Sequence, residues 1–251
     1  MKGLANLSID HPLFSGETAG EVCILTFKEM PLLHVTELES KEALFDYFEL
    51  VSGCDDVKAL LIKSASVKME RNEYIEFYQK KVASGADRVP FERMFNAVNQ
   101  CILKLAGLNK MVIHVDRGNV ILLFMNISLA CDYRIVADNT IYQNPNYELG
   151  VMPTGGTIFF LSKVLGSIKT SRLLLSGKDI SATQARELGF VDKVTPLADL
   201  DEFALEIAQT YASSPSGYCL GIKKLLNFDI KELSNYLEYE NQLFRKLTRP
   251  C

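Results

Sequence analysis

Met111–Gly166, MVIHVDRGNVILLFMNISLACDYRIVADNTIYQNPNYELGVMPTGGTIFFLSKVLG, is the stretch that decides the fold. It opens with a β-rich run at Val112–Val115. Ile121–Ala130 follows and is apolar on nearly every side, a pattern typical of a short buried helix. Tyr133–Val136 predicts a further strand. The stretch therefore predicts a strand, a buried helix and a second strand in succession.

The same alternation extends toward the N-terminus. Glu21–Phe27 is a compact apolar run that predicts a buried strand, and Val57–Ile62 predicts a second one. Helical spacing begins between them, after Thr36, which is a predicted N-cap with Glu39 three residues later in a capping box. Strand, helix and strand in this order favour right-handed crossovers in a layered α/β structure.

The remaining segments are mainly helical in pattern. Glu70–Gly107 is charged, and Gly85 and Pro90 divide it into two pieces. Ser181 is the predicted N-cap of a helix that ends at Gly189, a residue suited to a left-handed C-terminal position. Three more helices are predicted toward the C-terminus, at Leu200–Ala212, Tyr218–Leu226 and about Ile230–Leu247.

The composition is that of an ordinary globular protein. The 251 residues suffice for one large domain or two small ones, with 48% hydrophobic and 23% charged residues. A net charge of −4 leaves no basic footprint for nucleic acid. No apolar run reaches the roughly 18 residues of a membrane span. The N-terminal segment also lacks the apolar core of a secretory signal.

Cysteine spacing bears on the cellular compartment. Six cysteines are spread along the chain without a CxxC pair: Cys23, Cys54, Cys101, Cys131, Cys219 and Cys251. This spacing favours free thiols in a reducing environment over a disulfide framework or a zinc site. We therefore expect a cytoplasmic protein without a bound metal.

A series of short motifs matches one protein family in collinear order. The matching residues are Ala130, Cys131, Asp132, Arg134, Ala137, Pro145, Gly150, Pro153, Gly155, Gly156, Thr157, Gly177, Ser181, Ala182, Ala185 and Gly189. On these residues the chain resembles the enoyl-CoA hydratase/isomerase (crotonase) family. The resemblance covers about residues 20–250.

The resemblance implies an α/β fold of the crotonase type. Residues 1–195 would form a spiral of ββα units, and residues 196–251 a C-terminal helical region. Such helices help to build trimers in this family, so the resemblance implies a homotrimer or a dimer of trimers. The implied substrate is an acyl-CoA thioester, which carries its own coenzyme A, so no separate cofactor is expected.

The family polarises the thioester carbonyl with two backbone N–H groups, which stabilise an enolate oxyanion. Counted from Asp132, the three glycines of the family fall on Leu122-Leu123-Phe124, and one donor becomes the amide of Leu123. A backbone N–H survives every substitution except proline. The other donor corresponds to the amide of Val67 or Lys68, in a segment shorter than in the family.

The acid–base residues of the family are replaced. Hydratases use two glutamates, which correspond here to Asn126 and Asn146. A side-chain amide can bind water but cannot accept a proton at neutral pH, which argues against the usual glutamate mechanism. Glu148 is a candidate substitute, because it would share a face with Asn146 if that loop is extended. His114 and Asp116, at the end of a predicted strand, form a second candidate pair.

The nucleotide end of coenzyme A requires positive charge. Lys28, Lys63 and Lys68 follow the first two strands, and Lys223 lies in the C-terminal helical part. Each is a candidate CoA-binding residue, although a single lysine is usually a solvated surface charge.

Two classes of function remain open. One is an enzyme that acts on an acyl-CoA thioester by enolate chemistry, with a lyase, isomerase, decarboxylase or hydrolase outcome. The other is a noncatalytic member that binds CoA or assembles with partners. Asn126, Asn146 and the Leu122-Leu123-Phe124 run favour the second class, whereas the retained Pro145–Thr157 loop favours the first.

Overall fold

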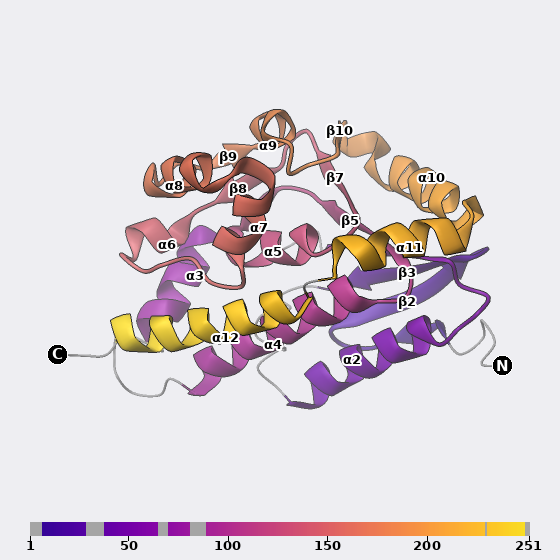
Figure 1. Ribbon diagram of the computed structural model, residues 1–251, viewed down its shortest axis with the longest axis horizontal. Helices are drawn as coiled ribbons and strands as arrows, with labels where there is room; N and C mark the ends of the chain where they lie inside the picture. Colours follow the sequence, from indigo (N-terminus) through magenta and orange to yellow (C-terminus); the bar gives the residue numbers. More distant parts are fainter. Residues whose placement is uncertain (1–6, 29–37, 65–69, 81–88, 229, 249–251) are drawn as a thin grey trace.

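The computed structural model describes residues 7–28, 38–64, 70–80, 89–228 and 230–248 of an α/β fold (Figure 1). Within these ranges the main sheet has seven strands in the order β1-β2-β3-β4-β5-β7-β10. They are β1 (Ile9–Asp10), β2 (Phe14–Ala19), β3 (Val22–Phe27), β4 (Ala59–Lys63), β5 (Met111–Asp116), β7 (Tyr133–Ala137) and β10 (Lys193–Thr195). The first three strands are antiparallel, and β3 through β10 are parallel, as predicted crossovers require.

A smaller sheet supports the helix at the centre of the fold. Its described strands are β6 (Asn119–Ile121), β8 (Ile141–Gln143) and β9 (Ile180–Ser181). The chain passes directly from β6 into α5 (Leu122–Leu129), so the start of α5 is fixed by the sheet. Leu122 and Met125 of α5 pack with Tyr142 and other residues of this sheet in a separate core cluster.

Helices cover both faces of the main sheet. Ala204 and Ala208 of α10 (Leu200–Ser213) pack on one face. The other face meets α2 (Leu38–Ser52), α4 (Val89–Gly107) and α12 (Ile230–Leu247), and α12 lies along α4 (Figure 1). Alternation along the strands supplies both cores, since Cys23 and Ile24 of β3 point to opposite faces. The other helices are α3 (Arg71–Tyr78), α6 (Pro145–Glu148), α7 (Thr157–Leu165), α8 (Ser167–Leu175), α9 (Ala182–Leu188), η3 (Leu197–Asp199) and α11 (Ser216–Leu226).

Most elements predicted from the sequence are confirmed. Ser181 caps α9 in a capping box with Gln184, and Gly189 ends that helix with a φ of 88°. The predicted N-cap at Thr36 and the break at Gly85 lie outside the described residues. The prediction missed β2, whose sequence FSGETA lacks apolar alternation, and the small sheet, whose strands have two or three residues. The boundary between residues 195 and 196 stays a prediction.

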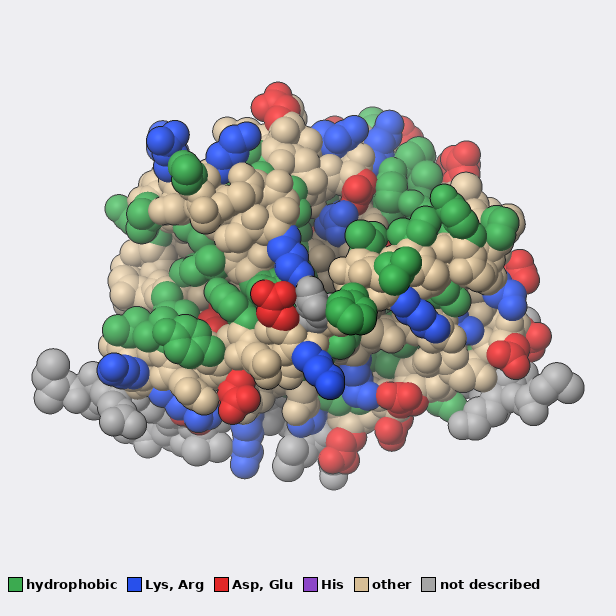
Figure 2. Space-filling model, viewed as in Figure 1, with side chains coloured by type: hydrophobic (Ala, Val, Ile, Leu, Met, Phe, Trp, Pro, Cys, Tyr) green, Lys and Arg blue, Asp and Glu red, His purple; other side chains and the backbone are tan. Residues whose placement is uncertain are grey.

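The surface has two features that bear on partners. In the described ranges, no helix combines the length and apolar character needed to cross a bilayer. Apolar side chains are exposed over α11 (Figure 2), where Tyr218, Leu225 and Leu226 have relative exposures of 71%, 77% and 76%. Exposed apolar side chains gathered on one helix indicate a contact surface. We call this group, together with Ile222 and Phe228, the α11 patch.

Candidate functional site

The start of α5 presents backbone N–H groups. Ile121 is the N-cap in an extended conformation, and it offers no side-chain hydrogen bond to the first turn. N–H groups of a first helical turn have no partner inside the helix, and they lie at its positive end. Leu123 is the second residue of α5, and its side chain is buried with an exposure of 3%. The predicted donor is therefore at a helix N-terminus, although its side chain belongs to the core.

Asn126 lies one turn further along α5 and has no exposed surface. Its Nδ2 atom donates to the carbonyl of Thr154 at 2.8 Å and to Oγ1 of Thr157 at 2.9 Å. Its Oδ1 atom is buried without a hydrogen-bond partner among the described residues. Asn126 thus ties α5 to residues 152–157, which we call the glycine turn.

Glycine at position 155 is required by this contact. Gly155 has a φ of +76°, and a Cβ atom there would lie 2.9 Å from Nδ2 of Asn126 and 3.1 Å from Cδ1 of Leu123. Both the left-handed backbone and the short approach exclude a larger residue without rearrangement. The structure therefore brings Leu123, Asn126 and the glycine turn into direct contact.

Asn146 reaches the same turn from the other side. It belongs to α6, is buried, and donates through Nδ2 to the carbonyl of Met152 at 3.2 Å. Tyr74 of α3 is its neighbour: burial raises the pKa of the Tyr74 hydroxyl, and the nearby Asn146 side chain opposes that rise. The two asparagines at the positions expected for the family's glutamates therefore both donate to backbone carbonyls of the glycine turn.

Glu148 faces away from this arrangement. Residues 145–148 form a helical turn rather than an extended loop, so Glu148 does not share the face of Asn146. Its carboxylate instead pairs with Arg71 of α3, which also binds Asp179, and its side chain is about half exposed. The condition under which Glu148 would replace the missing carboxylate is not met.

His114 and Asp116 lie inside the core. Nδ1 of His114 is 3.6 Å from Oδ2 of Asp116, so the prediction that both side chains point the same way is confirmed. Both residues are buried, and the Tyr142 hydroxyl donates to Asp116 at 3.3 Å. This geometry describes a buried polar network between β5 and β8.

The lysines predicted to bind CoA have different surroundings. Lys28 pairs with Asp10, and Lys63 lies 3.5 Å from Asp201 of α10. Val67 and Lys68 lie outside the described residues. Lys28 follows β3, and Lys63 is the last residue of the neighbouring parallel strand β4, so both lie at the C-terminal ends of these strands.

Lys223 of α11 makes its described polar contacts within the protein. Its side chain is buried, and Nζ donates to Asp132 at 2.7 Å, to the Lys110 carbonyl at 2.8 Å and to the Leu105 carbonyl at 3.5 Å. An ammonium group has three donors, and all three point to the protein. These contacts hold α11 on the core, and a role for Lys223 in binding CoA stays a prediction.

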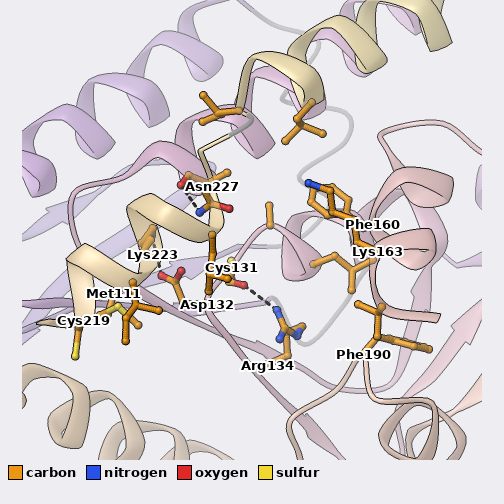
Figure 3. A pocket seen from close by; sticks show the side chains of 18 of the residues that line it. Met111, Cys131, Asp132, Arg134, Phe160, Lys163, Phe190, Cys219, Lys223 and Asn227 are labelled. Atoms are coloured by element: carbon orange, nitrogen blue, oxygen red, sulfur yellow. Dashed lines mark hydrogen bonds and ion pairs between the residues drawn. The ribbon is translucent and has the colours of Figure 1, made fainter. Parts of the chain in front are cut away.

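A cavity of about 510 Å³ lies beyond the C-terminal end of α5 (Figure 3). Lys163 and Phe160 of α7 line one side, and Lys223 and Asn227 line the side near α11. Arg134 enters from β7 and donates to the Cys131 carbonyl at 2.8 Å. This cavity adjoins the α11 patch, and its wall is mainly apolar.

A buried glutamate was missed by sequence reasoning. Glu240 of α12 has an exposure of 1% and accepts hydrogen bonds from the amides of Gly155 at 2.7 Å and Gly156 at 3.1 Å. Burial raises its pKa from 4.5 to about 7, against the opposing effect of the two amides. A signal did exist, because Glu240 continues the helical spacing of Leu233, Leu237 and Phe244.

The part of the chain that the structure describes contains no group of three or more histidine, cysteine, aspartate or glutamate residues able to hold a metal ion.

Comparison with protein families identifies the class to which this fold and site belong. The model of the family described as enoyl-CoA hydratase/isomerase matches residues 83–250, which is more than half of the chain. The chain belongs to the enoyl-CoA hydratase/isomerase family.

Individual relatives carry names from the same family. The 2,3-dehydroadipyl-CoA hydratase of Escherichia coli (strain K12) is 30% identical over 145 residues, which span 57% of either chain. The short-chain-enoyl-CoA hydratase of Clostridium acetobutylicum is 23% identical over 238 residues, or 91% of this chain and 86% of the relative.

The solved structures agree on the fold. The crystal structure of enoyl-CoA hydratase from Bacillus halodurans matches with a TM-score of 0.77 at 19% identity, covering 95% of this chain and 96% of that one. The crotonase-type α/β fold expected from the sequence is confirmed.

Proposed function

We propose that this chain binds an acyl-CoA thioester and stabilises its enolate with the backbone N–H of Leu123. The observation that carries the proposal is the close approach of Gly155 to the side chains of Leu123 and Asn126 in the first turns of α5. Backbone donors aimed at a developing oxyanion contribute strongly to the rate of such reactions. Lys28 and Lys63 are the described cations proposed to bind the nucleotide end of CoA. The backbone amide of Val67 or Lys68 is the proposed second oxyanion donor, and the Lys68 side chain is a further proposed cation.

The proposed chemistry does not use a glutamate pair. Asn126 and Asn146 cannot take up a proton, and Nδ2 of each donates to the glycine turn. Oδ1 of Asn126 remains as a buried acceptor without a partner in the described ranges. Such an atom suits a bound water molecule or a substrate donor. Enolate formation that needs no protein base, such as loss of CO₂ from a malonyl-type thioester, fits these groups better than hydration does.

A noncatalytic role is the second candidate. The buried Leu123 side chain and the structural hydrogen bonds of Asn126 favour it. In that case the chain would bind CoA or assemble with partners without turning over a thioester.

Calorimetry with CoA, butyryl-CoA, crotonyl-CoA and malonyl-CoA tests the proposal. We expect heat of binding and turnover of at least one thioester. Leu123→Pro removes the N–H at a position where the helix does not use it, and Leu123→Ala is the matched control that keeps it. Loss of one oxyanion donor costs about 10²–10³ in rate, so turnover should fall in the proline variant only.

The outcomes separate the candidates. Binding without turnover supports the noncatalytic role, and titrations that are flat for every thioester defeat the thioester proposal. Circular dichroism of both variants shows whether α5 is retained.

A homotrimer or dimer of trimers is the proposed assembly, with residues 196–251 as the assembling region. The α11 patch and the adjoining cavity support a protein contact there. Light scattering should report an oligomer that Leu225→Glu with Leu226→Glu disrupts and that the exposed control Lys224→Glu leaves intact. A monomeric wild-type protein would contradict this assembly.

The thiols of Cys23, Cys54 and Cys101 are free and buried, which supports the proposed cytoplasmic location.

A further inference from the structure

Glu240 is a buried carboxylate in α12, a helix whose other charged residues are mostly exposed. α12 carries charged residues along most of its length, yet Glu240 points into the core with Leu237 and Phe244. Among the described residues it has no ion pair, and its polar contacts are the amides of Gly155 and Gly156. Burying a carboxylate is costly unless hydrogen bonds replace water, so these two amides account for its tolerance.

The two amides lie just before α7. Gly156 is the N-cap of α7, so the negative carboxylate sits at the positive end of that helix. Oε2 of Glu240 accepts from both glycines, at 2.7 Å and 3.1 Å, and Oε1 lies 3.3 Å from the Gly156 nitrogen. One carboxylate therefore fixes two consecutive peptide groups of the glycine turn.

The same turn contacts the candidate thioester site on its other side. Position 155 packs against Asn126 and Leu123, and the Thr154 carbonyl accepts a hydrogen bond from Asn126. A shift of the turn away from α12 would therefore change the support of both residues at the start of α5. Glu240 and Asn126 therefore both hydrogen-bond the glycine turn.

We propose that Glu240 is a positioning residue that holds the glycine turn against Asn126 and Leu123 and so couples the C-terminal helix to the thioester site. This inference rests on the proposed function for its consequence in ligand binding. Its structural part, the link from Glu240 to Asn126, stands on the contacts alone.

Among the described groups that face Glu240, none other is expected to change its charge near pH 7. On α12, the titratable neighbour is Tyr236, whose pKa is raised to about 12 mainly by burial and also by the charge of Glu240. Tyr236 therefore stays neutral near pH 7. From the glycine turn, the contacts are the two amides. From α7, the Phe159 ring packs on Tyr236 and the Phe160 ring lies next to Gly156, and neither of these rings is titratable. The described side of α4 faces α12 through Asn96, Asn99 and the ion pair of Glu92 with Arg245.

Nuclear magnetic resonance of the full chain tests the inference without any ligand. The signals to follow are the backbone amides of Gly155 and Gly156 and the side-chain NH₂ of Asn126. Glu240→Gln keeps the shape and one acceptor oxygen but removes the charge. Glu238→Gln is the matched control, because Glu238 is exposed on the same helix.

We expect the glutamine variant to speed exchange of the two glycine amides by about tenfold, since a charge-assisted hydrogen bond becomes a neutral one. The Asn126 NH₂ signals should shift with them. In the wild type, the positions of these signals should change between pH 5 and pH 8, and in Glu240→Gln they should not. The Glu238→Gln spectra should match the wild type throughout.

Each outcome decides the inference. Unchanged glycine exchange in Glu240→Gln overturns it, and so does altered exchange with an unchanged Asn126 signal. If the wild type binds a thioester, Glu240→Gln should weaken that binding several-fold, and equal affinity also overturns the coupling. If the wild type binds no thioester, the proposed function fails, and the Asn126 signal alone decides whether Glu240 positions the turn.

Discussion

The region around α5 and the C-terminal helices differ in where they hold buried charge. Near the start of α5 the polar side chains are the neutral amides of Asn126 and Asn146, which bind backbone carbonyls. The C-terminal helices instead place Lys223 and Glu240 in the core, with exposures of 4% and 1%. The comparison teaches that the described candidate site offers neutral amides and backbone dipoles, whereas ionisable groups join the C-terminal helices to the core.

Removal of the Lys223 charge should have the largest effect on stability. Lys223→Met leaves Asp132 partly buried without its ammonium partner, which typically costs about 3–5 kcal/mol. Urea denaturation should show this loss, while Lys224→Met, at the exposed neighbouring position, should leave the free energy of unfolding nearly unchanged. Equal midpoints for the two variants would show that α11 does not depend on this ion pair.

The charge of Glu240 should make stability depend on pH. Its folded pKa of about 7 lies above the ordinary value of 4.5, so the folded state binds the proton more tightly than the unfolded state does. The resulting stabilisation is fully present below pH 4.5 and is lost as pH rises through about 7. The difference between these two pKa values corresponds to about 3 kcal/mol in the free energy of unfolding.

Denaturation of the wild type and Glu240→Gln at pH 5, 6, 7 and 8 measures this dependence. The slope between pH 5 and pH 7 should be present in the wild type and in Glu238→Gln, and it should be reduced in Glu240→Gln. Parallel profiles for all three proteins would contradict the raised pKa.

Restoring the two carboxylates should convert the neutral site into one that hydrates. Asn126→Glu with Asn146→Glu supplies groups able to accept and donate protons, which usually contribute about 10²-fold or more. We expect a gain of that order in hydration of crotonyl-CoA, followed by the loss of enoyl absorbance. Asn126→Gln with Asn146→Gln is the control of equal size, and it should show no gain. A folded glutamate variant that still lacks activity would place the thioester elsewhere.

Disruption of the Glu148 ion pair should have the smallest effect. Glu148→Gln weakens an exposed pair with Arg71, and exposed pairs contribute about 0–1 kcal/mol. Thioester binding and turnover should match the wild type. A large loss of turnover with an unchanged melting temperature would show that Glu148 reaches the substrate after all.

The fold was largely predictable because its strands and helices have clear apolar periods. Continuous apolar runs predict the buried strands β3, β4 and β5, and apolar residues at helical spacing predict α4. The small sheet was not predictable, because two or three residues cannot show a period. The role of β6 is to fix the start of α5, and this role becomes visible only in the folded structure.

The candidate site was only partly predictable. Motif order located Leu123, Asn126 and Asn146, and the structure brings them together at the glycine turn. The direction of the Glu148 side chain depends on whether residues 145–148 are helical or extended. A sequence of four residues does not show which of the two conformations is adopted. The burial of Lys223 and Glu240 was missed because charged residues in amphipathic helices usually face water, and only tertiary contacts show otherwise.

The central claim is that a thioester carbonyl docks on the N–H of Leu123. Infrared difference spectroscopy of butyryl-CoA labelled with ¹³C at the thioester carbonyl measures this directly, because a hydrogen bond to that oxygen weakens the C=O bond. The account predicts a carbonyl stretch at lower frequency in the complex than in solution, and a return toward the solution value in Leu123→Pro but not in Leu123→Ala. A bound thioester whose stretch equals that in solution would contradict it.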